Sequence, residues 1–142
     1  MKNKKILLIE DNEGDILLTK EAIEYHQHPH HLDVIKNGSD VKVYFNKLLS
    51  EANAQLPDLI FLDINLPKMN GQEVLHFLKS EPAIKHIPVI MLTTSSSQKD
   101  ILSSYQNGAN SYITKPVDVH AFMDSIAKVQ EYWYEVSKIP NH

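Results

Sequence analysis

Apolar residues follow two alternating patterns along this chain: short continuous runs, and longer segments in which they recur every three or four positions. A continuous run bounded by turn residues is typical of a strand that is buried on both faces. A spacing of three and four is typical of an amphipathic helix. The pattern predicts strands at 5–9, 32–35, 59–62, 87–92 and 111–116, and helices at about 12–25, 38–49, 71–81, 98–107 and 118–137.

Strand and helix therefore alternate five times, and each helical crossover is long enough to join parallel strands. Such a chain is expected to be an α/β protein with a doubly wound, five-stranded parallel sheet. The common strand order for five strands of this kind is 2-1-3-4-5. At 142 residues, the whole of 1–142 is expected to form a single domain.

The helical spacings also indicate which side chains face the sheet. The inward residues are expected to be Ile16, Leu17, Ala22 and Ile23 in the first helix, and Val41, Phe45, Leu48 and Leu49 in the second. The fourth helix is apolar only at Ile101, Leu102 and Tyr105, so it is expected to pack less firmly than the others.

Composition and charge narrow the possible functions. The chain has no cysteine, which excludes disulfides, cysteine nucleophiles and thiolate metal sites. A net charge of −4 argues against nucleic-acid binding, because no basic stripe is available for phosphates. The apolar run 6–9 is too short for a signal peptide or a membrane span. We expect a cytoplasmic protein whose partners are proteins and small ions, with no nucleic acid and no membrane.

Charged and hydroxyl side chains occupy the carboxyl ends of the predicted strands, at Glu10, Asp11, Asp63, Thr93 and Lys115. In a parallel sheet these positions share one edge, where ligands bind. Three carboxylates at close range repel unless a cation is present, and oxygen ligands favour a hard ion such as Mg²⁺. A carboxylate can accept a phosphoryl group covalently, and Lys115 with Thr93 would then bind its oxygens.

Simpler interpretations apply to each residue taken alone, since an acid or a serine at a strand end often only caps a helix. The combination of five such residues on one edge makes coincidence improbable. The histidines at 26, 28, 30 and 31 lack helical spacing and surround Pro29, so a solvated loop is favoured over a transition-metal site.

Glu10-Asp11, Asp63 with the segment 66–71 behind it, Thr93 and Lys115-Pro116 together resemble the signature of a response-regulator receiver domain. The resemblance covers nearly the whole chain and implies a flavodoxin-like (βα)5 fold. It implies that the protein is a signalling phosphoacceptor in a two-component phosphorelay rather than an enzyme, assisting only its own phosphorylation and dephosphorylation.

The resemblance also implies a role for each site residue. Asp63 would be the phosphoacceptor, and Thr93 and Lys115 would bind the phosphoryl oxygens. Tyr112 matches an aromatic switch position that responds to Thr93. The implied Mg²⁺ ligands are Glu10, Asp11, Asp63 and the backbone carbonyl of Asn65. Lys115-Pro116 matches a cis peptide of the family, and Asn65 and Ser95 match positions that tune dephosphorylation.

In this family a histidine kinase donates the phosphoryl group, and the face made by the fourth helix, fifth strand and fifth helix then changes. No residues remain after about Ser137 for an output domain, so a stand-alone receiver is expected. The tail around Tyr132 and Trp133 is similar to that of small response regulators that partner bacterial phytochromes. This likeness implies a phytochrome-type kinase partner and a homodimer.

The segment 118–142 is expected to extend beyond the core as an interface. Its apolar residues Phe122, Ile126 and Val129 fit a stripe facing the sheet. The aromatic side chains of Tyr132, Trp133 and Tyr134 are expected to lie past this stripe and to bind a partner.

Other classes remain open from the sequence. A Mg²⁺-dependent phosphatase or phosphotransferase also uses a strand-end aspartate, but such enzymes generally carry a second aspartate where this chain has Asn65. A flavin-binding module would need a phosphate loop after the first strand, where Glu10 and Asp11 would repel phosphate. A phosphorylation-independent adaptor is the third alternative, and the intact set of five site residues argues against it.

Overall fold

The sheet of this protein has the predicted architecture. The computed structural model describes residues 3–25 and 28–140. Its five strands are all parallel and lie in the order β2-β1-β3-β4-β5, which confirms the predicted doubly wound topology. The strands are β1 (Lys4–Ile9), β2 (His30–Ile35), β3 (Leu59–Leu62), β4 (Val89–Thr93) and β5 (Ser111–Thr114).

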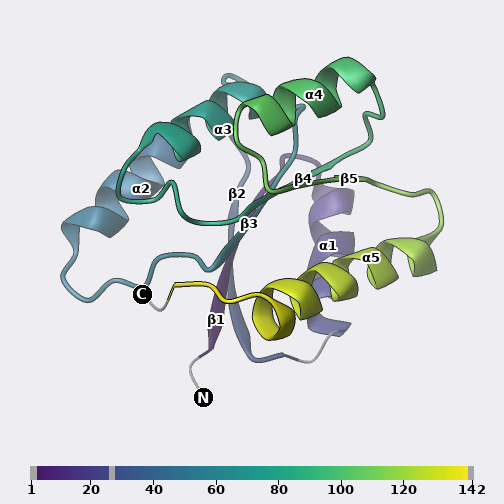
Figure 1. Ribbon diagram of the computed structural model, residues 1–142, viewed down its shortest axis with the longest axis horizontal. Helices are drawn as coiled ribbons and strands as arrows, with labels where there is room; N and C mark the ends of the chain where they lie inside the picture. Colours follow the sequence, from purple (N-terminus) through teal and green to yellow (C-terminus); the bar gives the residue numbers. More distant parts are fainter. Residues whose placement is uncertain (1–2, 26–27, 141–142) are drawn as a thin grey trace.

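Helices cover both faces of the sheet. In Figure 1, α2, α3 and α4 lie on one face, and α1 and α5 lie on the other. The helices are α1 (Glu13–Tyr25), α2 (Asp40–Ser50), α3 (Gly71–Ser80), α4 (Gln98–Gln106) and α5 (Val119–Glu131), which continues into a π-helical turn, η1 (Tyr132–Val136). In the part of the chain that the structure describes, no helix has the length and apolar character needed to cross a membrane.

The core is divided by the sheet because successive side chains of a strand point to opposite faces. Leu7, Ile9, Ile60 and Leu62 pack with α2 and α3, whereas Ile6, Leu8, Leu59 and Phe61 pack with α1 and α5. All eight side chains are almost completely buried. The continuous apolar runs of the central strands are therefore explained by the need to fill two separate cores.

Two of the side chains predicted to face the sheet, those of Leu17 and Leu49, do not. Leu17 is 59% exposed and Leu49 is 42% exposed, while Thr19 occupies a buried position on α1. Adjacent residues on an α-helix are about 100° apart, so a helix that buries Ile16 in a narrow stripe turns Leu17 toward solvent. The other inward residues of α1 are buried, as are Val41 and Phe45 of α2.

The second strand starts earlier than predicted. His30 and His31 belong to β2 and pair with Lys4 and Lys5 of β1, so they are not part of a loop. An edge strand makes its hydrogen bonds through the backbone and needs apolar side chains only on its covered face, which explains the missed boundary. His26 lies outside the described residues.

The C-terminal segment differs from its prediction in winding and in packing. The helix reaches Val136, close to the predicted end, but its last turn is π-helical. Trp133 and Tyr134 pack against the core shared by α1 and α5, instead of lying beyond it. Tyr132 and Val136 remain 50% and 65% exposed. Trp133 lies four positions after Val129, so it continues the stripe of Phe122, Ile126 and Val129 and packs on the same core.

Candidate functional site

The carboxyl ends of β1 and β3 place two acids side by side. The register pairs Ile9 with Leu62, and the N–H of Asp63 donates to the carbonyl of Ile9 at 3.0 Å. Glu10 and Asp63 are the next residues of the two strands, and both are buried, at 2% and 8% exposure. Two adjacent buried carboxylates require a cation nearby, because burial removes the water that would screen them.

Lys115 supplies one positive charge at this position. Its Nζ contacts Glu10 Oε1, lies 3.0 Å from Asp15 Oδ2 and lies 3.6 Å from Asp63 Oδ2. Its N–H donates to the carbonyl of Thr93 at 2.7 Å, which fixes the end of β5 beside β4. Burial alone would lower the pKa of Lys115, but the bond to Glu10 and the charge of Asp63 raise it above its usual value. The ammonium is therefore fully charged at neutral pH.

One lysine does not neutralise the whole cluster. Burial raises the pKa of Glu10 to about 7; the bond from Lys115 opposes this shift, and the charge of Asp63 adds to it. The second oxygen of Glu10 accepts the N–H groups of Asp11 at 3.1 Å and Asn12 at 3.3 Å. The raised pKa of Glu10 thus reflects mainly the loss of hydration on burial, with the nearby charge of Asp63 as a smaller cause.

The acids are spaced for a shared ion. One carboxylate oxygen from each of Glu10, Asp11 and Asp63 lies within 4.8 Å of the others. Among the residues that the structure describes, this is the one such cluster of three or more His, Cys, Asp or Glu side chains. Carboxylate oxygens with no sulfur or imidazole fit a hard divalent cation, so the donor set is compatible with Mg²⁺.

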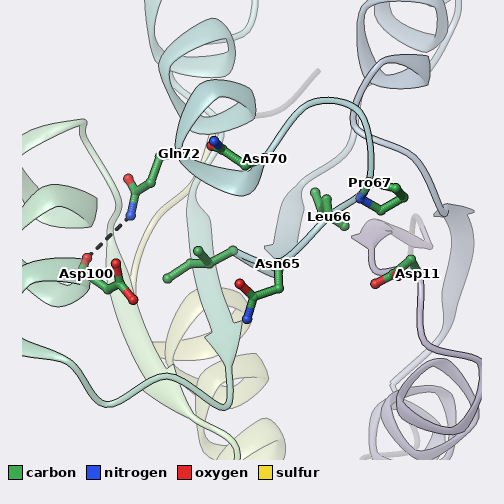
Figure 2. A pocket seen from close by; sticks show the side chains of 8 residues that line it. Asp11, Asn65, Leu66, Pro67, Asn70, Gln72 and Asp100 are labelled. Carbon is green, nitrogen blue, oxygen red and sulfur yellow. Dashed lines mark hydrogen bonds between the residues drawn. The ribbon is translucent and has the colours of Figure 1, made fainter.

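A cavity of about 480 Å³ lies beside these acids, between the loop after β3 and the first turn of α4. Figure 2 shows Asp11 on one side of it and Asp100 on the other, with Asn65 between them. Its lining is formed by Asp11, Ile64, Asn65, Leu66, Pro67, Asn70, Gln72 and Asp100. The N–H of Asn65 donates to Asp63 Oδ1 at 3.4 Å, so this loop contacts the central acid directly.

Two glycines permit the tight course of the loop after Asp63. A Cβ at Gly71 would lie 2.2 Å from the carbonyl oxygen of Asp63, and a Cβ at Gly38 would lie 1.9 Å from that of Met69. Gly71 also donates its N–H to the carbonyl of Ile64 at 2.7 Å. Close backbone approach, rather than an unusual φ, is what requires glycine at these two positions.

Thr93 is connected to α4 and β5 by a network that was not predicted from the sequence. Thr93 is completely buried, and its Oγ1 accepts the N–H of Ser95 at 3.3 Å. Ser95 Oγ donates to Asp100 Oδ2 at 2.6 Å, and the hydroxyl of Tyr112 donates to the carbonyl of Ser95 at 2.9 Å. The spacing of Ser95 and Asp100 around the helix cap at Ser97 was the available sequence signal, because a first-turn acid commonly pairs with a nearby hydroxyl.

The structure thus brings together Glu10, Asp11, Asp63, Thr93 and Lys115, with Asn65 and Tyr112 adjacent. The expected cis bond at Lys115-Pro116 is wrong, since no peptide bond among the described residues is cis. The trans form of an X–Pro bond is favoured by roughly 0.5–1 kcal/mol, and this small preference prevails here.

The three C-terminal aromatics do not join this site. Tyr134 lies near Lys4, whose Nζ is 5.6 Å from the ring centre, and near the ring of His28 at 4.8 Å. Lys4 begins β1, so this cluster occupies the opposite edge of the sheet from Asp63. The role of Tyr132, Trp133 and Tyr134 as an interface stays a prediction.

Comparison with known proteins gives consistent matches. The family described as "Response regulator receiver domain" matches residues 6–127. Response regulator Rcp1 of Synechocystis sp. is 34% identical over 96% of this chain and 93% of its own length. The crystal structure of the phosphorylated cyanobacterial phytochrome response regulator RcpA superposes with a TM-score of 0.89, at 39% identity, covering 99% of this chain and all of that one (100%). The Mn²⁺-bound form of Rcp1 gives a TM-score of 0.86 at 33% identity, covering 97% and 99%.

Proposed function

Because this chain belongs to the response regulator receiver domain family, we propose that it accepts a phosphoryl group on Asp63 from a sensor histidine kinase. It would act in the cytoplasm as the receiving member of a two-component phosphorelay. Its role is signalling, and the chemistry it assists is confined to its own phosphorylation and dephosphorylation.

One observation carries this proposal: a buried aspartate that has both a lysine ammonium and two further carboxylates as close neighbours. Lys115 Nζ lies 3.6 Å from Asp63 Oδ2, and Glu10 and Asp11 offer oxygens within 4.8 Å. A solvated surface aspartate would need none of these neighbours. The arrangement supports an acid that gains and then holds a larger negative charge.

The transfer itself requires little of the protein beyond position and charge. A carboxylate oxygen of Asp63 would form a bond to phosphorus as the phosphorus–nitrogen bond of the donor histidine breaks. Lys115 would attract the transferred oxygens, and the hydroxyl of Thr93 would donate to one of them. The cavity beside Asp63 gives the donor room to approach from the side of Asn65.

Glu10, Asp11 and Asp63, with the backbone carbonyl of Asn65, would hold Mg²⁺. When bound, the ion would offset the charge of the carboxylates and of the phosphoryl oxygens. Lys115 already contacts Glu10 and Asp63, so the protein's own residues supply part of this compensation before any ion binds.

Phosphorylation would act on the network around Thr93. A hydroxyl that turns toward a phosphoryl group on Asp63 weakens its bond to the Ser95 N–H. Ser95 in turn accepts the Tyr112 hydroxyl and donates to Asp100, so both β5 and α4 would respond. The exposed side chains of Leu102, Tyr105 and Tyr132 lie on the elements expected to change.

A phytochrome-type kinase is the proposed partner, by similarity to RcpA and Rcp1. A homodimer is proposed on the same similarity, with Tyr132 as the best exposed of the three C-terminal aromatics. Size-exclusion chromatography with light scattering should show a dimer for the wild type and a weaker one for Tyr132→Ala. Monomers in both samples, with and without phosphorylation, would remove the dimer from the proposal.

Intact mass after incubation with acetyl phosphate and Mg²⁺ tests the central claim. The wild type should gain one phosphoryl group, and Asp63→Asn should gain none. Circular dichroism establishes that both proteins are folded. A folded wild type that gains no mass would contradict the proposed function, as would equal labelling of the variant.

A further inference from the structure

α4 is held in place differently from the other helices. Ser104 is the only buried residue among its nine, all of which the structure describes. Leu102 and Tyr105 are 59% and 49% exposed, so apolar packing contributes little to its position. Polar contacts must therefore account for much of what fixes this helix.

Most of these polar contacts come from one side chain, that of Gln72 in the first turn of α3. Its Nε2 donates to Ser104 Oγ at 2.9 Å, and its Oε1 accepts from Asn107 Nδ2 at 3.1 Å. A longer contact of 3.4 Å joins Nε2 to the carbonyl of Asp100, drawn as a dashed line in Figure 2. Gln72 thus reaches the first turn, the middle and the C-cap of α4.

The same helix is tied to the site through Asp100. Its carboxylate accepts the Ser95 hydroxyl at 2.6 Å, and the Ser95 N–H donates to Thr93 Oγ1 at 3.3 Å. Gln72 and the Thr93 hydroxyl are therefore linked through two intermediate residues, Asp100 and Ser95, each of which contacts both of its neighbours. Any movement of Thr93 toward Asp63 acts on a helix that Gln72 holds at three points.

We propose that Gln72 is a positioning residue that stabilises the unphosphorylated arrangement of α4 and opposes phosphorylation of Asp63. This inference rests on the proposed function, because it concerns the response to a phosphoryl group. The three hydrogen bonds from Gln72 to α4 must weaken when this helix moves, so their free energy adds to the cost of reaching the phosphorylated arrangement. Removing these hydrogen bonds should make the phosphorylated arrangement easier to reach.

Gln72→Leu removes the three hydrogen bonds to α4 but leaves the buried Ser104 hydroxyl without its Gln72 partner, which costs stability. Gln72→Leu with Ser104→Ala removes both partners and should restore most of that stability, because two apolar groups then meet. His76→Leu is the matched control, one turn along the same helix and exposed. Beryllofluoride, a phosphoryl analogue, serves as the probe, with affinity measured by isothermal titration calorimetry.

Beryllofluoride affinity should rise about fivefold in both Gln72→Leu proteins and stay at the wild-type value in His76→Leu. Amide hydrogen exchange over 98–106, measured without the probe, should be faster in the single variant Gln72→Leu than in the wild type. A gain that is present in the single variant and lost in the stable double variant would reduce Gln72 to a structural role and overturn the proposal.

The two measurements, amide hydrogen exchange and beryllofluoride affinity, separate a failure of this inference from a failure of the proposed function. Unchanged amide exchange over 98–106 in Gln72→Leu would overturn the claim that Gln72 stabilises α4, whether or not beryllofluoride binds. Faster exchange with unchanged beryllofluoride affinity would overturn its regulatory role. A folded wild type that fails to bind beryllofluoride would contradict the proposed function, and the regulatory role of Gln72 with it.

Discussion

Replacing Gly71 by alanine should displace the loop that follows Asp63. The added methyl would lie 2.2 Å from the carbonyl oxygen of Asp63 and 2.5 Å from Cα of Ile64. Both atoms belong to the backbone, so no side chain can rotate away to make room. Overpacking typically costs about 1–3 kcal/mol, and weakening the 2.7 Å Gly71–Ile64 hydrogen bond adds about 1 kcal/mol. We expect a loss of roughly 2–4 kcal/mol in the free energy of unfolding.

A loss of this size leaves an ordinary small domain folded at 25 °C, so the effect on the site can be measured separately. Urea unfolding gives the stability change, and intact mass after acetyl phosphate treatment gives the rate of phosphorylation, which should fall with the displaced Asp63. Gly14→Ala is the control, since its methyl meets only the Asn12 side chain at 3.3 Å and alanine favours a helix. Gly71→Ala within about 0.5 kcal/mol of the wild type, with normal labelling, would refute the steric argument.

Three further changes test other parts of the structure. Lys115→Met should lower the unfolding free energy in urea by about 3 kcal/mol, because Glu10 and Asp63 lose their buried cation, and unchanged stability would contradict that pairing. Removing divalent ions with EDTA should stop acetyl phosphate labelling, and excess Mg²⁺ should restore it; labelling that persists in EDTA would exclude an essential ion. Lys79→Met should cost about 1–3 kcal/mol in urea unfolding, since its Nζ donates to the carbonyls of Lys85 and Ile87 and to Asn110 Oδ1, and a neutral result would make these bonds dispensable.

The sheet and the centre of the site could be predicted because both depend on local sequence. Four buried residues in a row, as in Leu59 to Leu62, have few structures open to them other than a central parallel strand. Once the strands are parallel, topology alone brings Glu10, Asp63, Thr93 and Lys115 to one edge. The position of these residues therefore needed no knowledge of side-chain contacts.

Other features depend on contacts between distant segments, which periodicity does not encode. Leu17 and Ile16 are both apolar, and only the width of the α1 contact decides which is buried. Trp133 continues the spacing of Ile126 and Val129 and packs on the core, whereas Val136, three positions later, is exposed. The spacing of apolar residues does not show where the covered part of the stripe ends. Gln72 was not singled out, since a glutamine on a helix is usually solvated, and its partners Ser104 and Asn107 lie more than thirty positions away.

The glycine contacts on either side of the β3–α3 loop also determine where the chain can be lengthened. The Met69 carbonyl fills the space beside Gly38, and the Asp63 carbonyl fills the space beside Gly71, so the number of residues between these contacts is fixed. Inserted residues there would have to displace backbone on two sides. The turn at Asn53, exposed and with φ 65° between α2 and β3, carries no such constraint. A fluorophore tag or a circular-permutation break that must leave the loop after Asp63 undisturbed therefore belongs at Asn53.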